Sequence, residues 1–176
     1  TAGDFVTNDT NGLTVTGTNT ALAAGEVVQI SLDGGATWAA TTPVTGTSWT
    51  HATAALGNGS YSFQTRVIDA GGLTGPIASQ AVVIDAGVPA APALIGTDDV
   101  APVIGAIANG STTNDSQPTL GGTAEPGATV TLTIDGTPVT VTADAAGNWN
   151  YTTAMLANGA HTVSVTQTDA AGNVSA

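Results

Sequence analysis

The chain contains an internal repeat, and this repeat limits the folds that are possible. A shift of 100 residues places Trp49 on Trp149. The other pairs, at shifts from 100 to 106, are Asn58-Gly59 with Asn158-Gly159, Asp33-Gly34 with Asp135-Gly136, Asp69-Ala70 with Asp169-Ala170, and Thr7-Asn8-Asp9 with Thr113-Asn114-Asp115. Small loop insertions produce shifts that drift in this way, and a repeat of this length is a supersecondary or domain-sized unit. A length of 176 residues suits two small domains, which we place at residues 1–87 and 88–176.

Within each copy, apolar and polar residues alternate in short runs separated by Gly, Asn and Asp. Two examples are EVVQISLDG (26–34) and YSFQTRVID (61–69). A period of two is typical of strands that bury one face, whereas no segment shows the 3.6-residue period of a helix. About seven such strands in each copy predict an all-β fold of two tandem immunoglobulin-like β-sandwich domains.

The charge of the chain is one-sided. Thirteen acidic residues face one arginine, Arg66, and no lysine, which gives a net charge of −12. Nucleic acids and anionic membranes bind through Lys and Arg, so neither is an expected partner. No apolar run approaches the roughly 20 residues of a membrane span. The excess of carboxylates instead suits divalent cations, which prefer hard oxygen ligands.

Cysteine is absent from the sequence, so disulfides and thiolate zinc sites are excluded. A cysteine-free β-domain of this size fits an extracellular bacterial protein better than a secreted eukaryotic one, and the lack of cysteine alone is also compatible with a cytosolic protein. No signal peptide is visible, and because the first residue is Thr1 we expect an excised fragment.

Several motifs recur in order and carry a family resemblance. They are SLDGGATW (31–38), GTAEPGATVTLTIDG (122–136), DAAGNWNYTT (144–153) and LANGAHTVSVTQTDAAGNVS (156–175). These motifs resemble the Ig-like repeats of very large secreted bacterial adhesins of the RTX type. The resemblance implies a seven-stranded sandwich, tandem arrays, type I export and calcium at the joints between domains. It also implies a calcium-rigidified extender (stalk) segment on the bacterial cell surface. Such a segment contacts neighbouring Ig-like repeats and projects a ligand-binding region for adhesion or biofilm formation.

The stretch 82–119 is interpreted as the joint between the two domains. A sandwich with an odd number of strands has its ends at opposite poles, so the end of domain 1 should face the DAAGN loop (169–173) of domain 2. The expected calcium ligands at this joint are Asp85, Asp98, Asp99 and Asp169, and whether Asp115 joins them depends on where the first strand of domain 2 begins. The corresponding set at the free end of domain 1 is Asp4, Asp9 and Asp69. The alternative is that these aspartates only cap turns, as Asp often does.

Other polar residues give weaker signals. Asp33 and Asp135 occur in Asp-Gly turns and are expected to be structural, while Asp144 is a weaker ligand candidate. His161 replaces Tyr61 at an inward strand position and is expected to be packed. No catalytic triad, phosphate-binding loop or metal-binding His pair is present, so an enzyme is not expected.

The tryptophans leave a second function open. Trp49 and Trp149 recur at one position, which favours core packing, whereas Trp38 has no counterpart and is expected to be exposed. An exposed Trp38 suits the alternative of a carbohydrate- or matrix-binding Ig-like module that contacts a host or matrix glycan or protein.

The end of the second copy differs from the end of the first. The run ASQAVVID (78–85) follows Asp69, but the sequence after Asp169 has no such run. We therefore expect domain 2 to lack its final strand, which leaves 161–169 with an open edge. That edge is either completed by a strand from another molecule or frayed.

Overall fold

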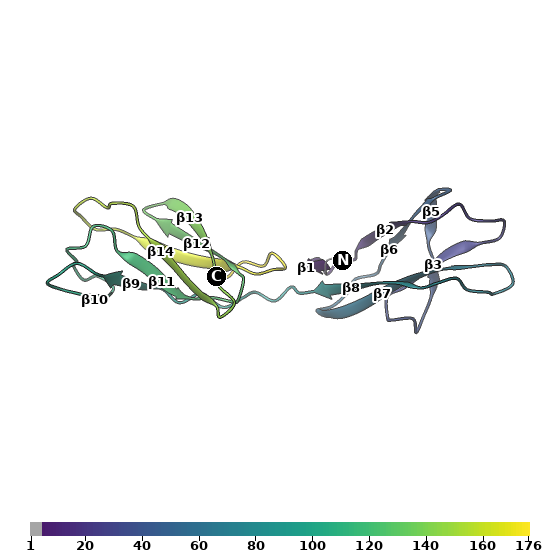
Figure 1. Cartoon of the computed structure of the whole chain (residues 1–176), viewed down its shortest axis with the longest axis horizontal. Coiled ribbons are helices and arrows are strands. Elements are labelled where there is room, and N and C mark those ends of the chain that lie inside the picture. Colours follow the sequence, from purple (N-terminus) through teal and green to yellow (C-terminus); the bar gives the residue numbers. More distant parts are fainter. Residues whose placement is uncertain (1–4) are drawn as a thin grey trace. The chain divides into compact units, whose positions relative to one another are not determined.

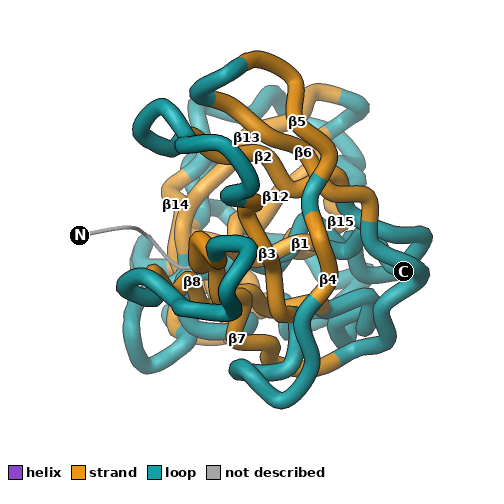
Figure 2. Tube along the Cα trace, turned by 90° about the vertical axis from the view of Figure 1, so that its right-hand side faces the viewer, coloured by secondary structure: helices purple, strands orange, loops and turns teal. Residues whose placement is uncertain are grey.

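The computed structural model describes residues 5–176, and the predicted ligand Asp4 lies outside them. The chain folds into two compact units, Thr1–Gly87 (unit 1) and Val88–Ala176 (unit 2). The described residues form only strands and loops, which confirms the predicted all-β fold (Figures 1 and 2). In this part of the chain no helix has the length and apolar character to cross a membrane.

Unit 1 is a sandwich of two sheets. Its strands are β1 (Phe5–Thr7), β2 (Thr14–Thr18), β3 (Val27–Ser31), β4 (Ala39–Ala40), β5 (Thr42–Thr45), β6 (Ser48–Ala52), β7 (Gly59–Ile68) and β8 (Ala78–Ile84). One sheet has the order β1-β8-β7-β3-β4 and the other the order β2-β6-β5. Strand β1 is parallel to β8, and the other pairs are antiparallel.

The core of unit 1 follows from the alternation in its strands. Val28 and Ile30 of β3 are buried with Trp49, while Phe63 of β7 is buried with Val82 and Ile84 of β8. Successive side chains of a strand point to opposite faces, so each second residue enters the space between the sheets.

Unit 2 repeats this plan with differences at its edges. Its strands are β9 (Ile95–Asp98), β10 (Gly105–Ile107), β11 (Thr119–Thr123), β12 (Thr129–Ile134), β13 (Thr137–Thr142), β14 (Asn148–Thr152) and β15 (Val163–Thr168). The sheet orders are β10-β9-β11-β14 and β13-β12-β15. The interpretation of 82–119 as a joint is therefore wrong for much of its length, because β9 and β10 belong to the sandwich of unit 2.

The two repeated tryptophans occupy the same place in their sheets. Gly17 of β2 pairs with Trp49 of β6, and Gly122 of β11 pairs with Trp149 of β14. A Cβ atom at Gly17 would lie 2.2 Å from the ring of Trp49, so only glycine leaves room for the indole. Trp49 and Trp149 are 7% and 3% exposed, which confirms the predicted core packing.

Candidate cation-binding site

Each aspartate of the predicted calcium set whose contacts the structure gives closes a local turn. One carboxylate oxygen accepts a hydrogen bond from the backbone N–H two residues later. The pairs are Asp9 with Asn11 (2.9 Å), Asp69 with Gly71 (2.8 Å), Asp85 with Gly87 (2.9 Å), Asp98 with Val100 (2.8 Å), Asp115 with Gln117 (2.8 Å) and Asp169 with Ala171 (2.8 Å). Asp stabilises turns in this way whether or not a metal is bound, so one oxygen of each side chain has a structural role.

The second oxygen distinguishes these aspartates from one another. At Asp169, Oδ2 accepts a hydrogen bond from the Asn173 side-chain amide at 2.9 Å. Burial opposes ionisation of Asp169, but the hydrogen bonds from Asn173 and nearby backbone amides outweigh it and lower the pKa of this carboxyl group. The Asp169 carboxylate is therefore satisfied by its own loop.

Asp98 and Asp115 form a different arrangement at one end of unit 2. Their side chains are 2% and 8% exposed. The hydroxyl of Thr113 donates a hydrogen bond to Asp98 Oδ2 and accepts one from the backbone N–H of Asp115 at 3.0 Å. The Thr113 hydroxyl thus links the Asp98 carboxylate to the backbone of Asp115.

The remaining oxygen of Asp115 is buried and has no partner. Asp115 Oδ2 has almost no solvent-accessible surface and makes no hydrogen bond within the described residues. A buried carboxylate oxygen without a donor is costly, because water solvates it strongly in the unfolded chain. A cation at this oxygen would remove the cost, so the atom fits a metal ligand.

The surroundings of Asp115 offer further oxygen atoms. A surface cavity of about 310 Å³ is lined by Pro102, Val103, Thr112, Thr113 and Asn114. Within residues 5–176, however, no group of three or more His, Cys, Asp or Glu side chains gathers around one point. A cation here would have two carboxylates at most, completed by hydroxyl, carbonyl or water oxygens.

The predicted aspartates of unit 2 lie at two ends of the sandwich. Asp98 ends β9 beside the start of β11, since Thr97 pairs with Thr119. Asp169 follows Thr168, which pairs with Thr129 beyond the other end of β11. Figure 1 shows the yellow loop after β15 at the opposite end of unit 2 from β10. The expected gathering of Asp98 and Asp99 around Asp169 is therefore not observed, because residues 95–98 form a strand instead of a linker.

Unit 1 separates its candidates in the same manner. The backbone N–H of Asp85 donates to the carbonyl of Thr7 at 2.8 Å. Asp85 therefore lies at the same end of unit 1 as the turn at Asp9, which comes directly after Thr7 and Asn8. Asp69 follows the opposite end of β7, because β8 runs antiparallel to β7. Asp9 thus lies away from Asp69, contrary to the expected grouping. In unit 2, Asp99 is exposed next to Asp98.

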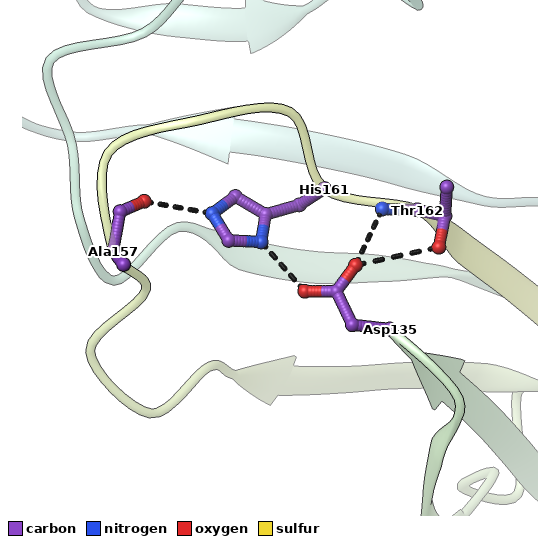
Figure 3. A network of polar contacts seen from close by, with 4 residues as sticks. All are labelled: Asp135, Ala157, His161 and Thr162. Atoms are coloured by element: carbon purple, nitrogen blue, oxygen red, sulfur yellow. Dashed lines mark hydrogen bonds and ion pairs between the residues drawn. The ribbon is translucent and has the colours of Figure 1, made fainter.

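The Asp-Gly turns have structural partners, as expected. Asp33 accepts hydrogen bonds from the hydroxyls of Ser31 and Thr37, both at 2.6 Å, and these bonds lower the pKa of its carboxyl group. Asp135 adopts a positive φ of 48° between β12 and β13. Its carboxylate contacts His161 Nδ1 at 2.6 Å and accepts a bond from the Thr162 N–H at 2.8 Å (Figure 3).

His161 is placed differently from its prediction. It is exposed and precedes β15, whereas we expected an inward strand position. Its Nε2 lies 2.7 Å from the carbonyl oxygen of Ala157, and this contact together with Asp135 raises the pKa of the imidazole. The hydrogen bond from His161 in turn lowers the pKa of Asp135. The pair links the loop before β15 to the β12–β13 turn.

Trp38 is half-buried, contrary to the expected exposure. The guanidinium carbon of Arg66 lies 3.9 Å from the centre of the Trp38 ring, a cation–π contact that covers one face. Arg66 also donates from Nε to Gln29 Oε1 at 3.0 Å, and the indole N–H of Trp38 donates to the Gly35 carbonyl at 3.0 Å. The sequence did not reveal this cluster, because it depends on the pairing of Gln29 with Arg66 between β3 and β7.

An apolar cavity of about 580 Å³ lies in unit 1. Core residues such as Leu13, Val15 and Phe63 line it, and exposed residues of β1 lie at its border. Asp9 is its one acidic lining residue, and the described lining contains no histidine. It therefore presents no pair of groups for acid–base chemistry.

Comparison with known proteins gives a family match for the second half of the chain. Residues 100–176 match the bacterial Ig-like domain family, which confirms the Ig-like fold for most of unit 2. A search of curated protein sequences gave no match.

Solved structures with a similar fold include fibronectin(III)-like modules of Clostridium thermocellum CbhA, with 17% identity, a TM-score of 0.46, and coverage of 98% of this chain and 84% of that chain. A 1.5-MDa bacterial ice-binding adhesin shares 22% identity with a TM-score of 0.41, over 96% of this chain and 55% of that chain. A Ca²⁺-stabilized adhesin of an Antarctic bacterium shares 24% identity with a TM-score of 0.38, over 95% of this chain and 42% of that chain. The chain thus spans about half or less of the two adhesin structures.

Proposed function

We propose that the chain is a calcium-stabilised tandem Ig-like spacer segment of a large bacterial surface adhesin. It lies outside the cell and carries a ligand-binding region elsewhere in the same protein for adhesion or biofilm formation. The bacterial Ig-like match of residues 100–176 and the repeated plan of the two units support the spacer role. The buried, unpartnered Asp115 oxygen supports the calcium, and it is the observation on which the proposal depends most.

The composition of unit 2 favours neutralisation of its buried carboxylates by a cation from solution over neutralisation by a Lys or Arg side chain. The chain has no lysine, and its one arginine, Arg66, belongs to unit 1. Asp98 and Asp115 are both buried, and the Thr113 hydroxyl bonds the Asp98 carboxylate and the Asp115 backbone N–H, so it leaves Asp115 Oδ2 in need of a positive charge or a further donor. A bound divalent ion supplies that charge and is stabilised by it.

Calcium fits this donor set better than zinc or magnesium. The available ligands are hard oxygen atoms, and neither cysteine nor histidine occurs among Asp98, Thr113 and Asp115. Calcium accepts irregular sets of 6–8 oxygens that include carbonyls and water, whereas magnesium requires near-ideal octahedral geometry. Asp85, Asp99, Asp169, Asp9, Asp69 and Asp4 stay predictions as ligands of further calcium ions.

The spacer role also explains the small amount of recognition chemistry in the chain. The ring of Trp38, which was the candidate for sugar stacking, has one face covered by Arg66.

Extracellular calcium modules bind with dissociation constants of about 0.1–1 mM, so such a site fills outside the cell and empties inside it. A segment that calcium stabilises in this way is therefore most stable outside the cell, where a surface protein functions.

The test is calcium binding to the full 176-residue chain and to the variants Asp115→Asn and Asp9→Asn. Isothermal titration should give a site with a dissociation constant of about 0.1–1 mM in the parent. Asp115→Asn keeps the turn to Gln117 but removes the charge, so this site should be lost. Asp9→Asn is the matched control for the Asp115 site alone, because Asp9 forms the same turn with Asn11 but is exposed and belongs to unit 1, so binding at Asp115 should be unchanged. Unchanged calcium binding by Asp115→Asn would show that the site is assigned wrongly.

A further inference from the structure

Arg66 supplies the one Lys or Arg charge in a chain that has thirteen acidic residues. Within residues 5–176 the single ion pair is that of His161 with Asp135, so no described carboxylate neutralises Arg66. The positive charge of Arg66 is therefore free to attract an anion from outside the chain.

The Arg66 side chain lies on the outer face of the sandwich. Successive side chains of a strand alternate between the two faces, so Arg66 points outward while Phe63 of the same strand is buried in the core. Gln29 is paired with Arg66 on the neighbouring strand β3, between the buried residues Val28 and Ile30. The side chains of Arg66 and Gln29 thus share the outer face of this sheet.

Two contacts hold the guanidinium group of Arg66 in place. Its Nε donates a hydrogen bond to Gln29 Oε1 at 3.0 Å, and its central carbon lies 3.9 Å from the centre of the Trp38 ring. The Trp38 ring is itself fixed, because its indole N–H donates to the Gly35 carbonyl at 3.0 Å. A side chain that is already ordered loses less conformational entropy when it binds a ligand.

The remaining donors of Arg66 have no acceptor in the part of the chain that the structure describes. The bond to Gln29 uses only Nε, which leaves the N–H groups of both terminal nitrogens. These two nitrogens form a planar fork whose geometry matches the two oxygens of a carboxylate. The orientation of Nε toward Gln29 therefore leaves the carboxylate-binding end of the guanidinium group available.

Gln64 adds a neutral polar group next to this fork. It lies two residues before Arg66 on the same face of β7, which is about 7 Å along the strand. A Cβ atom at Gly35 would lie 2.9 Å from Gln64 Oε1 and 3.7 Å from the ring of Trp38, so the Gln64 amide lies beside the turn that carries Trp38. An amide both donates and accepts hydrogen bonds, which suits a hydroxyl group of a ligand.

We propose that Arg66 and Gln64 bind a sugar acid, that is, a sugar unit with one carboxylate. The Arg66 fork binds the carboxylate and the Gln64 amide binds a neighbouring hydroxyl, while Gln29 and Trp38 position the guanidinium group. A long polyanion is not the expected ligand, because the net charge of −12 repels charges beyond the site. This inference is independent of the calcium site and of the spacer role.

Unit 2 provides an internal control for this site. Thr131 of β12 pairs with Thr166 of β15 at the place where Gln29 pairs with Arg66 in unit 1. Neither threonine carries a charge, and Trp38 has no counterpart in the second repeat. A sugar acid should therefore bind to unit 1 and not to the equivalent face of unit 2.

The test is an NMR titration of the full 176-residue chain with sodium glucuronate, sodium acetate and glucose at constant ionic strength. Glucuronate should shift the signals of the Arg66 Nε–H and the Trp38 indole N–H until they saturate, with a dissociation constant of about 1–10 mM. Acetate lacks the hydroxyls and should bind about fivefold more weakly, and glucose lacks the carboxylate and should not bind. The amide signals of Thr131 and Thr166 should not move.

Two variants test the role of the fork. Arg66→Lys keeps the charge but loses the planar fork, so glucuronate should bind at least about tenfold more weakly. Gln29→Glu keeps Arg66 but gives it a carboxylate within the chain, so glucuronate binding should be lost. The matched control is Thr131→Glu, which adds the same charge to unit 2 and should bind glucuronate like the parent. Gln29→Glu remains informative even if Arg66→Lys does not fold.

Any of three results overturns the proposal. The first is the lack of a saturable shift at Arg66 with glucuronate. The second is equal binding of acetate and glucuronate, since the site would then recognise any carboxylate, including that of an acidic peptide. The third is unchanged glucuronate binding by Gln29→Glu. None of these results would affect calcium binding at Asp115, so the two proposals fail separately.

Discussion

The two Thr-Asn-Asp turns have the same local structure in different surroundings. In unit 1 the N–H of Asp9 donates to the Thr7 hydroxyl at 3.1 Å, and in unit 2 the N–H of Asp115 donates to the Thr113 hydroxyl at 3.0 Å. Asp9 is exposed, but Asp115 is 8% exposed with an unpartnered oxygen. The local sequence therefore determines the turn, and the packing around the turn determines whether a carboxylate oxygen is buried without a hydrogen-bond donor.

The same contrast runs through both units and can be tested by paired substitutions. The tryptophans have equivalent positions, but Trp149 lies in the one buried cluster of unit 2 given by the described residues, whereas unit 1 has two such clusters. We expect Trp149→Ala to lower the free energy of unfolding of unit 2 by about 3–5 kcal/mol. Trp49→Ala should cost unit 1 less.

Hydrogen exchange measures this comparison in each unit separately. The buried residues Val130 and Ile30 report on unit 2 and unit 1, and both are at most 1% exposed. An equal loss of protection at the two reporters would contradict the difference between one cluster and two.

A second comparison uses Asp115→Asn and Asp9→Asn in the presence of a chelator. Without calcium, Asp115→Asn removes a buried charge that has an unpartnered oxygen, so we expect it to stabilise unit 2 by about 1 kcal/mol or more. Asp9→Asn should leave unit 1 within about 0.5 kcal/mol of the parent, because its side chain is exposed.

Adding calcium should reverse the order at Asp115. The parent gains stability from binding, about 1.4 kcal/mol when free calcium is tenfold above the dissociation constant, and the variant does not. Thermal melting of both proteins in chelator and in calcium measures the crossover. Curves that keep the same order in both conditions would argue against a cation at Asp115.

The smallest expected effect concerns Tyr61 and His161. The folded-state pKa of His161 is raised above its ordinary value of 6.5, so its contribution to stability is present below pH 6.5 and lost as the pH rises through the folded pKa. The pKa of Asp135 is lowered below 3.8, so its contribution is present above pH 3.8 and lost as the pH falls through the folded pKa. The pair therefore stabilises unit 2 most between these two values.

The variant His161→Tyr gives position 161 the residue type that unit 1 has at Tyr61, and it tests this pH dependence. Tyr61 makes the equivalent contact to Gly57 without a charge. We expect His161→Tyr to reduce the change in melting temperature of unit 2 between pH 6 and pH 8. The matched variant Tyr61→His should show a weaker pH response, because Asp33 is already bonded to Ser31 and Thr37.

Much of the fold could be predicted because strand alternation is a local signal. The run 61–69 became β7 (Gly59–Ile68), and the repeated tryptophans entered the cores. The proline-rich stretch after Asp85 was misjudged, since β9 is short and is recognised mainly by its pairing with β10 and β11. That pairing joins distant residues and has no signature in the stretch itself.

The candidate site could be predicted only in part. Asp98 and Asp115 were among the expected ligands, but the bond from Thr113 to the Asp98 carboxylate and the burial of Asp115 depend on the fold of unit 2. The predictions for Trp38 and His161 were wrong for a similar reason, because the contacts with Arg66 and Asp135 come from other strands or turns. Residue type indicates what a side chain can do, whereas its neighbours across the sheet decide what it does.

The position of Arg66 within β7 determines how the chain is digested by trypsin-like enzymes. A protease that cuts after Lys or Arg finds one peptide bond of that kind in the whole sequence, between Arg66 and Val67. This bond lies inside β7, which β3 pairs on one edge, while the Val67 carbonyl accepts from Gly75 on the other. Cleavage requires a locally unfolded chain, so trypsin-like enzymes can cut it only when unit 1 opens. Resistance to such enzymes thus reports directly on how often unit 1 unfolds.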